Sequence, residues 1–196
     1  FTTGTAGNYS VTTANGELTM TNASQAITIT AASDSKTYDG TALTASDVAI
    51  AEGSLLPGDE LVAEATGSAT NVADTAAGNN PVAAGYKVMH GTEDVTESYS
   101  IATEAGTLTI EPKAVTVTAA SEEFTYDGIA HSNDGFQVEG LVGSDAISAT
   151  VSGSITFPSQ SPVANEVASY EFTTGTAGNY SVTTANGELT MTNASQ

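Results

Sequence analysis

The stretch FTTGTAGNYSVTTANGELTMTNASQ, residues 172–196, organises this chain, because the same 25 residues also open it as residues 1–25. The two copies are identical at every position, and their first residues, Phe1 and Phe172, lie 171 positions apart. Identical segments of this length indicate internal repetition. We therefore expect the chain to be a window on a tandem array. A segment that recurs without change is also a poor place for a unique catalytic residue.

Alternating polar and apolar residues predict two strands within each copy of this 25-mer. In the first copy one strand is centred on Tyr9 and the other on Leu18, on either side of a turn at residues 14–16. We interpret residues 172–196 as the closing hairpin of the last module, and residues 1–25 as that of a truncated preceding one. Because an isolated hairpin is marginally stable in water, the first copy is predicted to dock on the following module or to complete a neighbouring chain by strand addition.

A second, divergent repetition divides the rest of the chain into two modules, residues 26–112 and 113–196. The pattern ITITAAS that begins at Ile27 returns as VTVTAAS at Val115, 88 positions later. Further matches, at shifts that fall from 88 to 81, are TYDG at 37–40 with 125–128, Asp59 with Asp145, Pro81 and Val82 with Pro162 and Val163, Tyr99 with Tyr180, and Leu108 with Leu189. The falling shift indicates that the second module lost loop residues and kept its strands. A short connection stiffened by Pro112 predicts a rod of modules rather than a flexible string.

Charge and composition exclude several classes of function. The 196 residues include 23 Asp and Glu against 3 Lys and Arg, for a net charge of -20, and no cysteine. Phosphates would be repelled, so nucleic acid is not expected as a partner. No run reaches the ~18 apolar residues of a membrane span, so no membrane insertion is expected in this segment. Disulfides and thiol chemistry are excluded. The chain lacks the start of a signal peptide, so we expect it to begin downstream of any targeting signal.

The spacing of strands and turns, with no sustained helical period, predicts an all-β fold. The expected architecture is two tandem small β-rich modules, each β-grasp-like or an immunoglobulin-like sandwich, plus the N-terminal hairpin from a preceding repeat. A module of this size buries only about 60–65% of its unfolded surface, so each is modestly stable alone. Contacts between neighbouring repeats are expected to add stability, as in other linear arrays.

The order of these motifs resembles a known family. A first strand reading ITITA or VTVTA is followed by TYDG, by a leucine-containing turn that ends in Asp, by SYS or NYS, and by a closing strand GTLTI or GELTM. This order is similar to the YDG and MBG-type repeats of very large bacterial cell-surface proteins and adhesins. It covers both modules and, in part, residues 1–25. The resemblance implies small β-rich modules strung in tandem on the cell exterior, and it implies no catalytic residue.

The residues that stand out are interpreted mainly as structural. The motif residues are Thr37, Tyr38, Asp39 and Gly40, Thr125, Tyr126, Asp127 and Gly128, with Tyr99 and Tyr180 near the closing strands. Asp-Gly is a turn signal, and each tyrosine is expected to fill the edge of a core. His90 and His131 have no counterpart in the other module, and no acid, base and nucleophile recur together, so an enzyme is not expected.

Calcium is the ligand most compatible with so many carboxylates, since hard cations prefer several oxygen ligands. The weak candidates are Asp39, Asp59, Asp94, Asp127 and Asp145, to which Glu93 and Asp134 can be added. None of them has the spacing of an EF-hand loop. The simpler interpretation is a solvated acidic surface, so no cofactor is predicted. Calcium shared between the loops of two modules is the alternative.

These features together predict a structural stalk or spacer segment of a repetitive bacterial surface adhesin, extracellular at the cell surface or wall, which projects a distal binding domain. Its first partners would be neighbouring repeats of the same chain. The alternative is an adhesive module that binds mucin, glycan or a host surface protein directly, through loops such as residues 71–80 or through the groove between modules.

Overall fold

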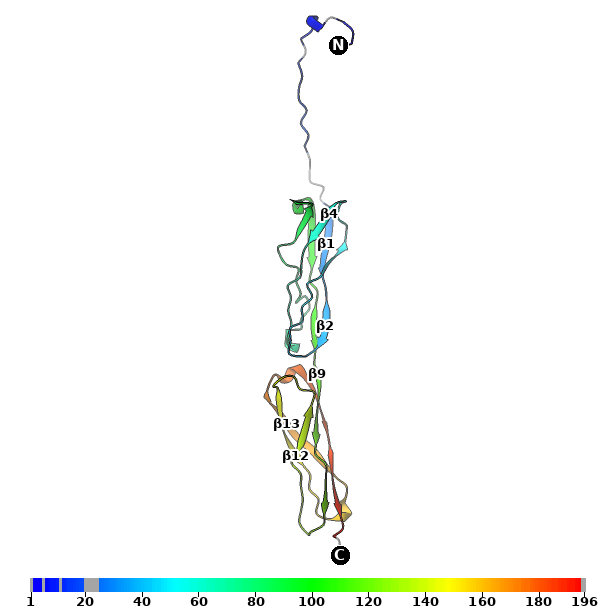
Figure 1. Cartoon of the computed structure of the whole chain (residues 1–196), viewed down its shortest axis with the longest axis vertical. Helices are drawn as coiled ribbons and strands as arrows, with labels where there is room; N and C mark the ends of the chain where they lie inside the picture. Colours follow the sequence, from blue (N-terminus) through cyan, green and yellow to red (C-terminus); the bar gives the residue numbers. More distant parts are fainter. Residues whose placement is uncertain (1, 5, 11, 20–24, 195–196) are drawn as a thin grey trace.

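Two β modules follow one another along the long axis of the computed structural model (Figure 1), which describes residues 2–4, 6–10, 12–19 and 25–194. These residues form strands and short 3-10 turns and no α-helix, so the predicted all-β class is confirmed. The sheet-held helix of a β-grasp is therefore not formed in the described part of the chain. No helix among these residues is long and apolar enough to cross a membrane.

The first module is an elongated sandwich with two cores. Its elements are β1 (Gln25–Ala31), β2 (Asp34–Thr37), β3 (Val48–Glu52), β4 (Asp59–Val62), η2 (Val72–Asp74), β5 (Lys87–His90), β6 (Glu93–Asp94), η3 (Thr96–Ser98), β7 (Tyr99–Glu104) and β8 (Leu108–Glu111). The sheet β3-β1-β7 packs on the sheet β4-β5-β6 through Ile27, Ile29 and Val88. Further along the axis, β2 and β8 form a second core around Leu108 and Ile110.

The second module repeats this plan with fewer loop residues. Its elements are β9 (Lys113–Ala119), β10 (Glu122–Thr125), β11 (Phe136–Glu139), β12 (Ala146–Ser152), η4 (Pro158–Gln160), β13 (Val163–Thr174), η5 (Ala177–Asn179), β14 (Tyr180–Ala185) and β15 (Gly187–Thr192). The sheet β11-β9-β14 encloses the first core with β12 and β13, around Val115, Val117 and Ile147. The second core gathers Ile155 and Leu189 near β10 and β15.

The first and last strands of each module pair in parallel along its whole length. In the first module β1 pairs with β7 and β2 with β8, in one continuous register in which partners lie 74 positions apart. In the second, β9 pairs with β14 and β10 with β15, at 67 positions. Only Pro112 separates the end of β8 from the start of β9. The last strand of one module therefore continues almost directly as the first strand of the next.

This pairing corrects the predicted hairpin. In residues 172–196 the two strands β14 and β15 follow one another along the module and pair with β9, β10 and β13, not with each other. Gln25 already belongs to β1, and the described positions among residues 1–19 form one 3-10 turn, η1 (Ala6–Asn8), and no strand. Their side chains are exposed wherever the structure describes them, so docking on the first module is not formed there. Positions 1, 5, 11 and 20–24 lie outside the described residues.

A buried asparagine and a glycine join the two cores at the middle of each module. The Asn80 amide donates to the carbonyls of Ala32 and Ala45, at 2.8 Å each, and its side chain is fully buried. Asn165 makes the same contacts in the second module, with Ala120 and Asn133. The structural counterpart of Val82 is therefore Val167, and the predicted match of Pro81-Val82 with Pro162-Val163 is wrong.

The glycine is required because the last strand passes very close to the first. A Cβ atom at Gly106 would lie 2.0 Å from the Ala32 carbonyl oxygen, and one at Gly187 would lie 2.2 Å from that of Ala120. Real Cβ atoms do not approach this closely, so only glycine fits without a shift of backbone.

Candidate functional site at the junction between the modules

The TYDG motif forms the end of the first module that faces the second. Gly40 has a φ of 80°, a left-handed backbone conformation that glycine adopts without steric cost. The Asp39 carboxylate accepts hydrogen bonds from the Thr41 N–H at 2.8 Å and from Lys36 Nζ at 2.8 Å. The Lys36 contact and the Thr41 N–H hold the pKa of Asp39 well below its ordinary value. This network fixes the turn and places the Tyr38 ring between the modules.

The facing surface of the second module is built around Tyr180. Its hydroxyl donates to the Asp145 carboxylate at 2.5 Å and accepts from the Val142 N–H at 3.2 Å, which fixes residues 141–145 over the end of the module. Burial, together with the hydrogen bond to Asp145, raises the pKa of Tyr180 to about 12. Phe172 stacks on the Tyr180 ring, with centroids 5.3 Å apart. The result is a rigid aromatic platform.

Apolar contacts close the junction. The Tyr38 and Tyr180 rings form an edge-to-face pair, with centroids 5.4 Å apart and planes at 82°. Tyr38 thereby packs against the cores of both modules. Gly40 approaches so near that a Cβ atom on it would lie 3.1 Å from the Val142 side chain. Edge-to-face aromatic pairs contribute about 0.5–1.5 kcal/mol beyond the area they bury.

A buried asparagine adds directional hydrogen bonds across the junction. Asn179 is 1% exposed, its Oδ1 accepts from the Val72 N–H at 2.9 Å, and its Nδ2 donates to Asn71 Oδ1 at 2.9 Å. The Asp74 carboxylate accepts from the Asn71 N–H at 2.8 Å and so holds η2 in position. Because these bonds have fixed geometry, they set both the tilt and the rotation of one module on the other.

The opposite end of the first module carries the same tyrosine and aspartate pair, with no second module against it among the described residues. The Tyr99 hydroxyl donates to Asp59 Oδ2 at 2.5 Å and accepts from the Leu56 N–H at 2.9 Å. Asp59 Oδ1 also contacts His90 Nδ1 at 2.6 Å. The hydrogen bonds from Tyr99 and then His90 lower the pKa of Asp59, while burial and Asp59 raise that of Tyr99.

Two further calcium candidates, Asp94 and Asp127, are engaged by neighbouring side chains. Asp94 accepts from Thr96 Oγ1 at 2.6 Å and contacts Lys87 at 2.9 Å, and these bonds lower its pKa to about 2. Asp127 contacts His131 at 2.9 Å, which lowers its pKa, and accepts from the Ile129 N–H. No group of three or more His, Cys, Asp or Glu suited to a metal ion occurs among the described residues. The structure thus does not bring the five predicted aspartates together in one site.

The loop of residues 71–80, considered above as a ligand contact, is used inside the module. Asn79 Nδ2 donates to the Leu108 carbonyl at 2.8 Å while its Oδ1 accepts from the Leu108 N–H at 2.6 Å, which extends the β8 edge. Asn80 is buried at the middle of the module and Asn71 lies in the junction. Few side chains of this loop therefore remain for an external ligand.

The sequence interpretation missed the asparagines that organise this junction. Asn179 stands in an ordinary Asn-Tyr-Ser triplet, and nothing in that triplet distinguishes a buried amide from a surface one. For the mid-module asparagines a signal was present, since Gly67 and Gly153 match at a shift of 86, and a Cβ atom on either would lie 2.5 Å from the Oδ1 of Asn80 or Asn165.

Comparison of the chain with protein families, with curated proteins and with solved structures finds no match. The geometry of the modules and of their junction therefore carries the functional argument.

Proposed function

We propose that this chain is a rigid stalk segment of a repetitive bacterial surface adhesin of the YDG/MBG-like type, and that it holds a distal binding domain away from the cell. The observation that supports this most directly is the strand path. The chain enters each module at one end, leaves it at the other, and pairs its first and last strands in parallel between those points.

This strand path favours resistance to tension. A force on the two ends of a module pulls β1 and β8 in opposite directions, parallel to the strands and across the β1-β7 and β2-β8 ladders. In a parallel ladder the hydrogen bonds are evenly spaced and run on a slant from one strand to the other. They are therefore loaded together in shear rather than broken one at a time. In the second module the β9-β14 and β10-β15 ladders carry the load in the same way.

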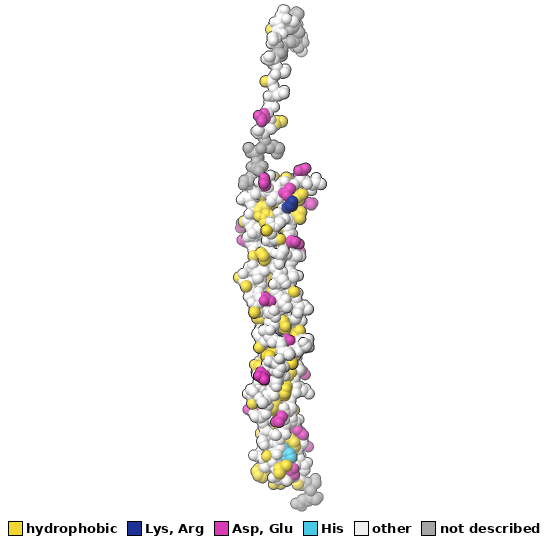
Figure 2. Space-filling view, turned by 90° about the vertical axis from the view of Figure 1, so that its left-hand side faces the viewer, with side chains coloured by type: hydrophobic (Ala, Val, Ile, Leu, Met, Phe, Trp, Pro, Cys, Tyr) yellow, Lys and Arg dark blue, Asp and Glu magenta, His cyan; other side chains and the backbone are white. Residues whose placement is uncertain are grey.

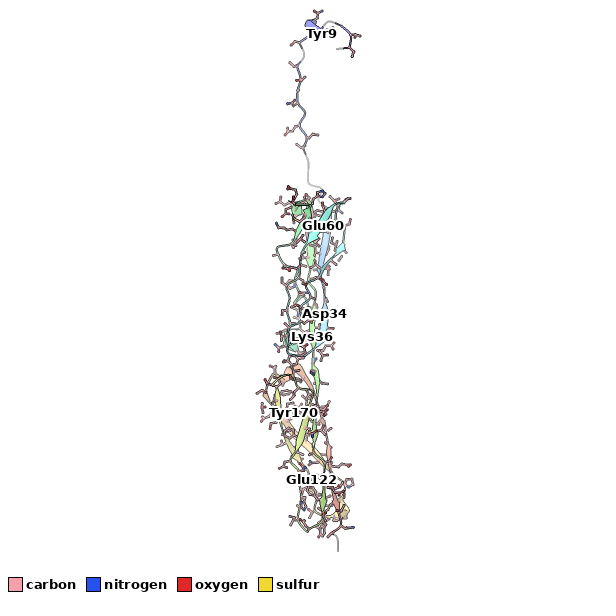
Figure 3. The ribbon with its side chains drawn as sticks, viewed as in Figure 1. Tyr9, Asp34, Lys36, Glu60, Glu122 and Tyr170 are labelled. Carbon is pink, nitrogen blue, oxygen red and sulfur yellow. The ribbon has the colours of Figure 1, made fainter. Side chains whose placement is uncertain are left out.

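The surface also fits a spacer. On the face shown in Figure 2, acidic side chains are distributed along the rod rather than gathered in one patch. The net charge of -20 disfavours association between neighbouring stalks. Charged and polar side chains also stand on the bodies of both modules, with Asp34 and Lys36 on β2 of the first and Glu122 and Tyr170 on the second (Figure 3).

Single-molecule stretching tests the proposed role. Pulling the chain from its two ends should give two unfolding events, one for each module. The matched control attaches the handles at Gln25 and Glu52, which lie at the same end of the antiparallel β1-β3 pair. This geometry unzips one bond at a time, so it should open the first module at lower force. Equal forces in the two geometries would refute the shear arrangement.

Rigidity can be measured separately, because the absence of cysteine allows clean labelling. Spin labels at Glu60→Cys and Glu122→Cys, one in each module, should give one narrow distance distribution. A broad distribution would contradict a rigid spacer. Saturable micromolar binding of the unlabelled chain to mucin or to a glycan array would favour the adhesive alternative instead.

A further inference from the structure

Most of the exposed large apolar side chains lie in the first 25-mer or toward the ends of the two modules. Seven large hydrophobic residues are exposed in the described part of the chain: Tyr9, Leu18, Leu56, Val62, Ile129, Phe157 and Tyr170. Tyr9 and Leu18 belong to the first 25-mer, whose second copy buries the equivalent Tyr180 and Leu189. Leu56 lies at the outer end of the first module, and Ile129 and Phe157 at the outer end of the second.

The outer end of the second module repeats the backbone hydrogen bonds of the first module's end at the junction. Gln160 Oε1 accepts from the Thr156 and Phe157 N–H groups at 2.8 Å, as Asp74 does from Thr70 and Asn71. Phe157 therefore occupies the place of Asn71. By the shift of 88, Tyr126 occupies the place of Tyr38 and Ile129 that of Thr41.

The side chains at this end are more apolar than those at the observed junction. Phe157 is 50% exposed and Ile129 61% exposed, and the Tyr126 and Phe157 rings lie 6.2 Å apart. Pro158 replaces Val72, so the N–H that binds Asn179 in the observed junction is absent here. A Cβ atom on Gly128 would meet nothing within 4 Å, whereas one on the equivalent Gly40 contacts Val142. This is an uncovered version of the same surface.

The outer end of the first module complements this surface. Leu56 is the counterpart of Val142, because its N–H donates to the Tyr99 hydroxyl as that of Val142 donates to Tyr180. The Leu56 side chain is 42% exposed. Ser98 precedes Tyr99 where Asn179 precedes Tyr180. In a junction of the same geometry Ser98 would face Phe157, as Asn179 faces Asn71 in the observed one.

We propose that the surface formed by Tyr126, Ile129 and Phe157 docks a second copy of the first module, residues 26–112, through its Leu56 and Tyr99 end. The repeated 25-mer supports this occupant, because residues 1–25 directly precede the first module and residues 172–196 complete the second. This proposal rests on the tandem spacer role proposed above and extends it to a second kind of junction. Polar and apolar junctions then alternate along an array.

The connecting segments explain why the second junction needs an apolar contact. Ile110 and Val115 are five positions apart, whereas their counterparts before the first module, Met20 and Ile27, are seven positions apart. Two additional residues allow roughly 7 Å of extra reach. The covalent link alone would therefore leave a hinge, and burial of Phe157 and Ile129 against Leu56 closes it.

The test extends the full chain by a second copy of residues 26–112 after Gln196, which reproduces the sequence around residue 25. Hydroxyl-radical footprinting with mass spectrometry then measures side-chain exposure. Phe157 and Ile129 should lose most of their reactivity relative to the 196-residue chain. Tyr170, exposed on β13, is the internal control and should not change.

Two further chains make the result specific. A flexible Gly-Ser insertion between Gln196 and the added copy tethers the module without aligning it, and should weaken the protection of Phe157. Leu56→Asp in the added copy should abolish it, while the added module still melts cooperatively. Unchanged reactivity of Phe157 in the extended chain would overturn the proposed docking. The stretching experiment would still decide the spacer role, because it tests the folded modules individually.

Discussion

The two copies of the 25-mer share every residue and differ in structure. In residues 172–196 the segment forms β14 and β15, with Tyr180, Leu189 and Met191 buried. In the first copy the described positions before Gln25, where β1 begins, form no strand, and Leu18 is fully exposed. The second copy pairs with β9, β10 and β13, whereas the described positions of the first copy before Gln25 pair with no strand. Strand formation here is thus decided by tertiary partners rather than by local propensity.

The largest expected effect comes from removing the folded copy. A chain of residues 1–171 lacks β14 and β15, so its second module should lose its entire stability, on the order of 5 kcal/mol or more. Residues 1–25 of a neighbouring chain can supply the same strands, so this chain should assemble into linear polymers. Size-exclusion chromatography and electron microscopy would detect them.

Three controls define that strand addition. A chain of residues 26–171 has no donor and should remain monomeric, with one module unfolded. A free peptide of residues 172–196 should restore that module and should cap the polymers of the first chain. Deleting residues 1–25 from the full chain should leave both melting transitions in place. Monomeric behaviour of residues 1–171 would show that the first copy cannot act as a donor.

Gly16 and Gly187 are the same position in the two copies of the 25-mer, yet substitution by alanine should affect stability very differently at the two sites. Gly187→Ala places a Cβ atom 2.2 Å from the Ala120 carbonyl oxygen, so the second module should lose about 3 kcal/mol as its backbone shifts. Gly16→Ala meets nothing within 4 Å and should leave both melting transitions unchanged. Urea denaturation of the two variants measures the difference. Equal effects would mean that Gly187 is not pressed against β9.

Alkaline pH should destabilise the folded copy through Tyr180. Its pKa is raised from 10.0 to about 12, so the folded module disfavours the tyrosinate. The associated stability is fully present below pH 10 and is lost as the pH rises toward 12. Tyr180→Phe should cost about 1–2 kcal/mol at neutral pH, because two hydrogen bonds are lost, and should flatten this part of the pH profile. Denaturation of the second module between pH 9 and about 12 gives the comparison.

The smallest effect is expected at the junction. Asn179→Ala leaves the Val72 N–H and the Asn71 side chain without their partner, for a loss of about 1–2 kcal/mol in coupling between the modules. The spin-label distribution between the modules should broaden. Asn8→Ala, the same change in the exposed first copy, should alter neither measurement. A narrow distribution in Asn179→Ala would assign the rigidity to Tyr38 and Pro112 instead.

The sequence was sufficient for the all-β class, because alternation around Ile27 and Val115 reports directly which side chains face a core. It was misleading for pairing. Two strands that are close in sequence suggested a hairpin, whereas each pairs with a strand about 67 positions away. Register over that distance depends on the close approach at Gly187, which no local pattern records. The junction could not be predicted, because the burial of Asn179 depends on a module 107 positions away.

The two cores placed end to end in each module have a consequence for surface area. The chain exposes 12283 Å², whereas a compact monomer of this mass would expose about 8,600 Å². Part of the excess belongs to the first 25-mer, and the rest follows from the narrow cross-section of the modules. A large hydrated surface per residue means little buried apolar area, but it also means a long reach for few amino acids. The rod is therefore long but has small cores, and each module buries part of its apolar surface only against its neighbour, as Tyr38 does at the junction.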